Sequence, residues 1–244
     1  MNLADVITID GPSASGKGTV AQQVAERLDF HFLDSGAMYR ATAYAAQRAG
    51  VDLGVASRYE RAIAQVAAGM DLRFVGNAIL LDNQEVGHHL RSEECGREAS
   101  KIAALPAVRA ALLQRQRDFR QAPGLVADGR DMGSVVFPDA RLKVFLTAGV
   151  EERARRRTAQ LSARAAASDD PKGLIEKENS GNISALFESV LKDLRDRDTR
   201  DSQRAVAPLA RLEEAKLLDT TDMSVEQAVR QVLAWYGDLP ATAA

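Results

Sequence analysis

Residues 6–19, VITIDGPSASGKGT, decide the fold of this chain. A short apolar run at 6–9 leads into a loop bounded by Gly11 and Gly16, and a helical pattern begins near Thr19. Such a loop turns successive backbone N–H groups inward, and the following helix adds its positive N-terminal end. The stretch therefore predicts a phosphate-binding P-loop, in which Lys17 is a mobile charge for the β- and γ-phosphates.

The loop departs from the strict P-loop pattern at one position. Gly18 stands where Ser or Thr is usual, and Thr19 follows it. We therefore predict that Thr19 supplies the hydroxyl near Mg²⁺. A dinucleotide-binding fingerprint is excluded, because Ser13 stands where its second glycine is needed.

Composition indicates a globular enzyme. The 244 residues are 45% hydrophobic and 27% charged, which allows one large domain or a core with insertions. A formal net charge of −2 gives no overall field for nucleic acid or an anionic membrane, so neither is an expected partner. Cys95 is the one cysteine, and we find neither a leader pattern nor an apolar run of membrane length, so we expect a cytoplasmic protein.

Strands and helices alternate through most of the chain. A helix after the P-loop leads to a strand at 30–33, and Tyr39 and Arg40 are expected to open the next helix. Residues 51–122 break the alternation with a hairpin around Gly76-Asn77 and a helical stretch at 93–120 interrupted by Pro106, so we interpret them as an inserted domain. Strands at 125–127, 142–146 and 216–219 resume the core, and a capping box formed by Ser224 and Gln227 starts the last helix.

Arginines gather in the second half of the sequence. The helix after residue 146 carries Arg153, Arg155, Arg156 and Arg157, either as a solvated face or as cations for a triphosphate. Residues 158–182, rich in Ala, Ser, Asp and Gly, are expected to form a mobile loop. Arg197, Asp201 and Arg204 are spaced four and three apart, which places them on one helix side and suits a sugar-phosphate ligand.

These motifs resemble the bacterial cytidylate kinases, a branch of the nucleoside monophosphate kinases. The matching stretches are ITIDGPS at 7–13, GKGT at 16–19, LDSGAMYR at 33–40, ADGRDMGSVVFPDA at 127–140 and RAVAPL at 204–209. The main departure from the family is at 158–196, which is longer and more polar than the family's usual lid.

The resemblance implies an α/β fold of the P-loop NTPase type with a parallel five-stranded core sheet. Its parts would be a core at 1–36, 123–150 and 205–244, a monophosphate-binding insertion at 37–122, and a lid with an arginine-rich helix at 151–204. ATP would be bound by the loop and by lid arginines, namely Gly11, Pro12, Ser13, Ala14, Ser15, Gly16, Lys17, Gly18, Thr19, Arg156 and Arg157.

By the same resemblance, CMP would be held by Ser35, Arg40, Ser100, Arg109, Arg130, Asp131, Arg197, Asp201 and Arg204. Ser100, Arg109 and Asp131 would face the base, Arg197 and Asp201 the ribose, and Arg40, Arg130 and Arg204 the phosphate. The roles of Ser100 and Arg109 rest on the resemblance alone.

The expected reaction is transfer of a phosphoryl group from ATP to CMP or dCMP in the presence of Mg²⁺. Lys17, Arg130 and Arg204 are the predicted catalytic residues, because phosphoryl transfer depends mainly on positioning and on neutralising charge. The alternatives are a kinase for another small acceptor such as UMP or AMP, and a non-catalytic nucleotide-sensing module. We expect a monomer with small-molecule substrates.

Overall fold

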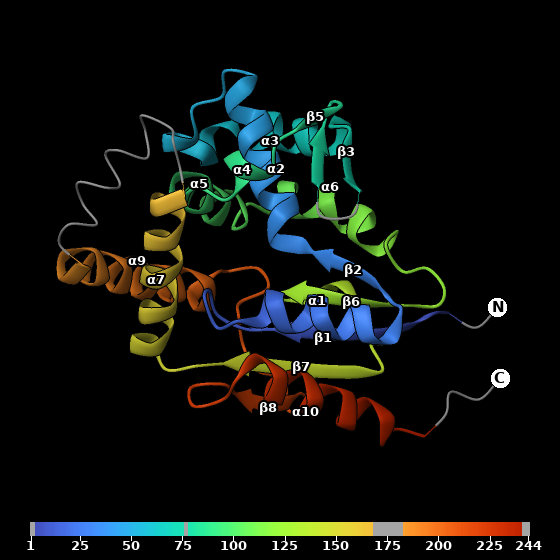
Figure 1. Ribbon diagram of the computed structural model, residues 1–244. Coiled ribbons are helices and arrows are strands. Elements are labelled where there is room, and N and C mark those ends of the chain that lie inside the picture. The colour runs from blue at the N-terminus through green and yellow to red at the C-terminus, as the bar shows by residue number, and fades with distance from the viewer. Residues whose placement is uncertain (1–2, 76–77, 168–182, 241–244) are drawn as a thin grey trace.

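The computed structural model describes residues 3–75, 78–167 and 183–240, and a five-stranded parallel sheet lies at its centre (Figure 1). The strand order is β2-β6-β1-β7-β8, with every neighbouring pair parallel. The strands are β1 (Asp5–Asp10), β2 (His31–Asp34), β6 (Gly124–Gly129), β7 (Leu142–Thr147) and β8 (Lys216–Asp219). The α/β fold with a parallel five-stranded core is confirmed.

Both faces of the sheet are buried, and successive side chains of β1 show why. Ile7 and Ile9 pack in one core cluster with α1 (Lys17–Leu28) and α10 (Val225–Gly237). Val6 points the other way, into a larger cluster that includes α2 (Ser35–Arg48). Strand side chains alternate between faces, so a run of apolar residues is what a central strand covered on both sides requires.

The P-loop forms where the sequence predicts it, between β1 and α1. Gly16 has φ 91° and directly precedes the helix, a conformation in which a Cβ is unfavourable. At Gly11 a Cβ would lie 1.9 Å from the carbonyl oxygen of Leu146, so only glycine allows the loop to pass β7 this closely. Backbone sterics therefore account for both bounding glycines.

Residues 35–75 and 78–117 build a second layer beyond the β2 side of the sheet (Figure 1). Its helices are α2, η1 (Leu53–Tyr59), α3 (Glu60–Gly69), α4 (Gly87–Leu90), α5 (Glu93–Ile102) and α6 (Pro106–Arg117), and its antiparallel strands are β3 (Leu72–Val75), β4 (Ala78–Leu81) and β5 (Gln84–Glu85). Pro106 occupies the first turn of α6, which confirms that the long helical stretch is interrupted there.

The expected start of α2 at Tyr39 is wrong by one turn. The helix begins at Ser35, because the side chain of Asp34 accepts a hydrogen bond from the Ala37 backbone N–H at 2.8 Å and caps the first turn. The predicted boundary between core and insertion, at residues 36 and 37, therefore falls inside this helix.

Two helices cross the carboxyl ends of the strands, α7 (Val150–Ala167) and α9 (Ile183–Gln203), as Figure 1 shows. They pack through a small cluster of Ala154, Val190, Leu191 and Leu194. The predicted loop at 158–182 is therefore wrong for residues 158–167, which continue α7. Alanine is the best helix former, and it is frequent there. The rest of that prediction, 168–182, lies outside the described residues.

The last helix begins with the predicted capping box of Ser224 and Gln227. None of the described helices is both long enough and apolar enough to span a bilayer. The short η2 (Met132–Val136) follows β6 and packs behind β1.

A polar cluster at the amino ends of the strands ties α10 to the sheet and leads to a stability prediction. The Tyr236 hydroxyl donates to Asp5 Oδ2 at 2.6 Å, and Arg141 pairs with the same carboxylate. We expect Tyr236→Phe to lose about 1 kcal/mol of unfolding free energy, a Tm decrease of roughly 2–4 °C. Thermal denaturation beside the exposed Tyr59→Phe as control would measure it. Equal Tm values for the two variants would contradict this role.

Candidate active site

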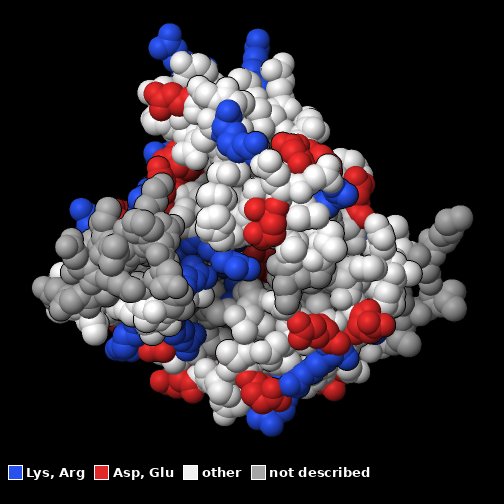
Figure 2. Space-filling view, turned by 45° about the horizontal axis from the view of Figure 1, so that its top comes forward, with Lys and Arg blue, Asp and Glu red and all other residues white. Residues whose placement is uncertain are grey.

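A cavity of about 320 Å³ opens at the carboxyl ends of β1, β2 and β6, between the P-loop, α2, α5, α7 and α9. Its walls carry an unusual density of cations. Figure 2 shows lysine and arginine side chains gathered in a hollow of this face. The cations that line the cavity include Lys17, Arg40, Arg130, Arg157, Arg197 and Arg204.

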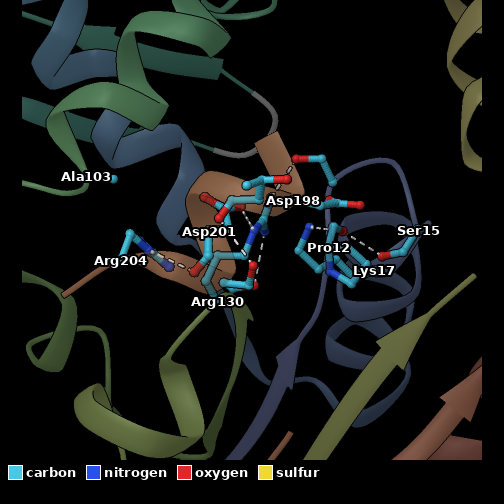
Figure 3. Close-up of polar contacts among 12 residues, drawn as sticks. Pro12, Ser15, Lys17, Ala103, Arg130, Asp198, Asp201 and Arg204 are labelled. Carbon is cyan, nitrogen blue, oxygen red and sulfur yellow. Dashed lines mark hydrogen bonds and ion pairs between the residues drawn. The ribbon is translucent and has the colours of Figure 1, made fainter. Parts of the chain in front are cut away.

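Lys17 lies at the P-loop end of the cavity and is 9% exposed. Its ammonium donates to the Pro12 carbonyl at 3.3 Å and lies 3.8 Å from Asp128 Oδ1 (Figure 3). Burial and the charge of Arg130 lower the pKa of Lys17 to about 8, while the charge of Asp128 opposes both effects. Phosphate groups beside this ammonium would favour its charged form.

Asp128 is the next-to-last residue of the fully buried strand β6 and faces Lys17. Burial raises the pKa of its carboxyl to about 6, and the nearby Lys17 ammonium works against that rise. Within the described part of the chain, its Oδ1 accepts no hydrogen bond. A cation or a water ligand of a cation would satisfy this oxygen.

Arg130 joins three parts of the site. Its Nε donates to Asp201 Oδ2 at 2.9 Å, and its Nη2 donates to Ser13 Oγ at 2.8 Å (Figure 3). A third bond, from Nη1, reaches the Gly129 carbonyl at 3.1 Å. Pairing with Asp201 raises the pKa of Arg130 despite its burial, so the guanidinium stays charged. One side chain thus connects β6, the P-loop and α9.

Arg197 and Arg204 flank Asp201 and have hydrogen-bonding capacity to spare. Among the described residues, the buried Nε of Arg197 and Nη2 of Arg204 have no partner. Burial and the charge of the neighbouring Arg130 lower the pKa of Arg197 to about 9. Burial also lowers the pKa of Arg204. An anionic ligand would accept hydrogen bonds from these unpaired N–H groups and would stabilise the charged forms of the crowded arginines.

The far wall holds the residues that the resemblance assigned to the base. Asp131 forms an ion pair with Arg109, and both side chains are buried. Arg109 also donates to the Tyr39 hydroxyl at 3.5 Å and to the Ala103 carbonyl at 3.4 Å. The buried Ser100 hydroxyl lacks a partner within the described residues. A hydroxyl without a partner and a carboxylate that line the same cavity suit a ligand with several polar groups.

Ser35 and Arg40 come from the first two turns of α2. Ser35 is buried, and Arg40 forms an ion pair with Asp34 at 2.9 Å. Asp34 thus caps the helix with one oxygen and holds Arg40 with the other. The cavity therefore brings together Ser35, Arg40, Ser100, Arg130, Asp131, Arg197, Asp201 and Arg204, with Arg109 directly behind Asp131.

The predicted ATP-side residues divide into two groups. Ser13, Ala14 and Lys17 line the cavity, as does Arg157, which pairs with Glu93. Arg156 instead lies against the outer side of the P-loop and donates to the carbonyls of Ser15 at 3.3 Å and Thr220 at 2.5 Å. Thr19 is exposed on α1 and is not part of the cavity lining. Its role as a magnesium ligand stays a prediction.

Arg153 is a member of the basic helix to which sequence reasoning gave no separate role. It is 4% exposed and donates to the Ser13 carbonyl at 3.1 Å, while its ion pair with Asp198 measures 2.6 Å. Asp10, Asp34 and Asp128 were also not assigned. Each is the last or next-to-last residue of a parallel strand, and this position was the signal that could have found them.

The parallel sheet, the glycine-bounded loop and the cation-lined cavity define a P-loop phosphotransferase. A family model described as "Cytidylate kinase" matches residues 7–237. Proteins named "Cytidylate kinase" from Chromobacterium violaceum and Bordetella pertussis are each 53% identical to this chain, over 237 and 233 residues. The alignments cover 97% of both chains in the first case, and 96% of this chain and 95% of the relative in the second. The chain belongs to the cytidylate kinase family.

Proposed function

We propose that this protein transfers the γ-phosphoryl group of ATP to CMP or dCMP, giving ADP and CDP or dCDP. The observation that carries the proposal is the cavity itself: the P-loop and Lys17 form one end, and Arg130, Arg197, Asp201 and Arg204 line another. A module that only sensed ATP would not need this second cationic end. Membership of the cytidylate kinase family supports CMP as the acceptor.

In this reaction an oxygen of the acceptor phosphate attacks the γ-phosphorus of ATP in line with the leaving oxygen. A phosphate monoester is already largely ionised at pH 7, so no protein base is required. Lys17 would follow the β- and γ-phosphates, while Arg130 and Arg204 would neutralise charge on the transferring group. Asp201 orients Arg130 through the 2.9 Å bond, which fixes the guanidinium before the substrate arrives.

The residues present fit a magnesium ion that accompanies ATP. The donor with a free site is Asp128, whose buried carboxylate oxygen lies beside Lys17. Carboxylate oxygens, often through water, are the ligands that Mg²⁺ prefers when it is bound with substrate phosphates. Asp128 would hold the ion, and Mg²⁺ would screen the charge of the phosphates.

The predicted division of the chain accords with this function. Residues 37–122 would carry the acceptor side, and 151–204 would close over ATP as a lid and exclude water. We also propose that the protein works in the cytoplasm as a monomer.

A coupled assay of ADP release tests the proposal directly. CMP, dCMP, UMP and AMP are each supplied with ATP and Mg²⁺, next to a reaction without acceptor. We expect rapid ADP release with CMP and dCMP and only background release without acceptor. Fastest release with UMP or AMP would instead identify another monophosphate kinase. ADP release that is independent of any acceptor would reject the kinase function.

A further inference from the structure

Asp10 is the last residue of β1, directly before the P-loop, yet its side chain turns toward a different segment. Its Oδ1 accepts a hydrogen bond from the Met132 backbone N–H at 2.9 Å, and its Oδ2 accepts one from the Gly133 N–H at 2.8 Å. Both oxygens are therefore used by the chain that follows Asp131. The side chain is buried, at 8% exposure for the residue, and does not line the cavity.

The two N–H groups belong to the first residues of η2, where a helix leaves its backbone donors without internal partners. The residue before the helix would normally supply a capping side chain, and here that residue is Asp131. Asp131 makes no cap hydrogen bond, because its carboxylate pairs with Arg109 instead. Asp10, on strand β1, therefore caps η2 in place of Asp131.

The close packing of β1 against this turn supports the same conclusion. A Cβ at Gly133 would lie 2.9 Å from the Thr8 hydroxyl oxygen and 3.3 Å from carbons of the Lys143 side chain. Glycine therefore lets the backbone approach β1 closely enough for both bonds to Asp10. The turn is held against the strand from which the P-loop emerges.

A gain in folding stability does not explain why a carboxylate is buried at position 10. Burial, together with the charges of Asp131 and Asp128, raises the pKa of Asp10 to about 7, although the two backbone N–H donors oppose the rise. A buried carboxylate near two others is electrostatically unfavourable. What the side chain provides is a fixed position for Met132 and Gly133, and through them for Asp131 and Arg130.

We propose that Asp10 is a positioning residue for the acceptor side of the reaction, capping η2 so that Asp131 and Arg130 can direct their side chains to the nucleoside monophosphate. The inference rests on the proposed function. It predicts that a defect at Asp10 appears in the use of CMP although the residue adjoins the ATP-binding loop.

The test is Asp10→Asn, which keeps the shape of the side chain but places an amide donor against one of the two N–H groups. We expect kcat/KM for CMP to fall roughly 10- to 100-fold, the range for losing a hydrogen bond to a charged group. The loss should appear mainly as a higher KM for CMP, with KM for ATP changing by less than about threefold. Asp5→Asn is the matched control, because Asp5 lies on the same strand at the opposite end of the sheet and should leave both KM values unchanged.

Amide hydrogen exchange at residues 130–134 is measured on the same samples. It should increase in Asp10→Asn and not in Asp5→Asn, whichever nucleotide proves to be the acceptor. Unchanged exchange would overturn the inference even if CMP phosphorylation itself were absent. Equal increases of KM for ATP and CMP would also overturn it, since they would indicate general damage to β1. If Asp10→Asn fails to fold, the same KM values and the same amide exchange are measured in Asp10→Ser, which retains one hydrogen-bond acceptor and lacks the opposing amide.

Discussion

Lys17→Ala is expected to reduce turnover at least ~100-fold while leaving CMP binding nearly intact. The ammonium lies at the P-loop end of the cavity, 3.3 Å from the Pro12 carbonyl oxygen, and would contact the phosphates of ATP. Loss of one preorganised charge contact in a low-dielectric site has an effect of this size on the transition state. The acceptor-side residues Arg130 and Asp201 keep their own contacts without Lys17.

Steady-state kinetics and calorimetric titration with CMP check the two halves of this prediction. Lys216→Ala, at an exposed lysine on β8, is the control for the loss of one surface charge. It should retain full turnover. A loss of CMP affinity in Lys17→Ala comparable to the loss of turnover would show that Lys17 serves the acceptor, contrary to the assignment.

Asp131→Ala is expected to bring the activities with CMP and UMP closer together. A carboxylate accepts a hydrogen bond from the N4 amine of cytosine and repels the carbonyl oxygen that uracil has at that position. One hydrogen bond to a charged group contributes ~1.5–3 kcal/mol, so the preference for CMP should fall by roughly 10- to 150-fold. Asp131 is buried at the cavity wall, as a residue that recognises a base would be.

The ion pair with Arg109 offers the competing explanation, in which Asp131 only orders the arginines around it. Removing one member of a buried pair leaves an uncompensated charge, so some loss with both nucleotides is expected in either case. Values of kcat/KM for CMP and UMP in Asp131→Ala and Asp131→Asn separate the two explanations. A uniform decrease with an unchanged CMP/UMP ratio would make Asp131 a structural support. Asp139→Ala, at a surface carboxylate paired with Arg120, is the control and should change neither value.

Features encoded within a few consecutive residues were predictable. The P-loop, the start of α6 at Pro106 and the capping box of Ser224 and Gln227 all depend on local backbone geometry. The spacing of Arg197 and Asp201 was also informative, because residues four apart lie on one helix side. The expectation that Arg204 shares this helix is wrong: α9 ends at Gln203, and Arg204 lines the cavity from the chain just after it. The helix start at Ser35 was missed although its signal, a capping aspartate, was present in the sequence.

The arrangement of the site also depended on contacts between residues far apart in the chain. The bond of Arg130 to Ser13 and the ion pair of Arg153 with Asp198 join segments that no sequence spacing relates. Residues 158–167 were expected to belong to a loop, but they continue α7, because they are rich in alanine and α7 packs against α9.

The sequence by itself determined the phosphate-binding loop and the alternation of strands and helices, because these follow from local sterics and hydrophobic periodicity. The parallel five-stranded sheet was expected from the family resemblance. Only the tertiary structure decided which charges are paired and which are left for a ligand. Asp131 is free to pair with Arg109 because Asp10 caps the following turn from another strand, and such a bond exists only after β1 and β6 have come together in the sheet.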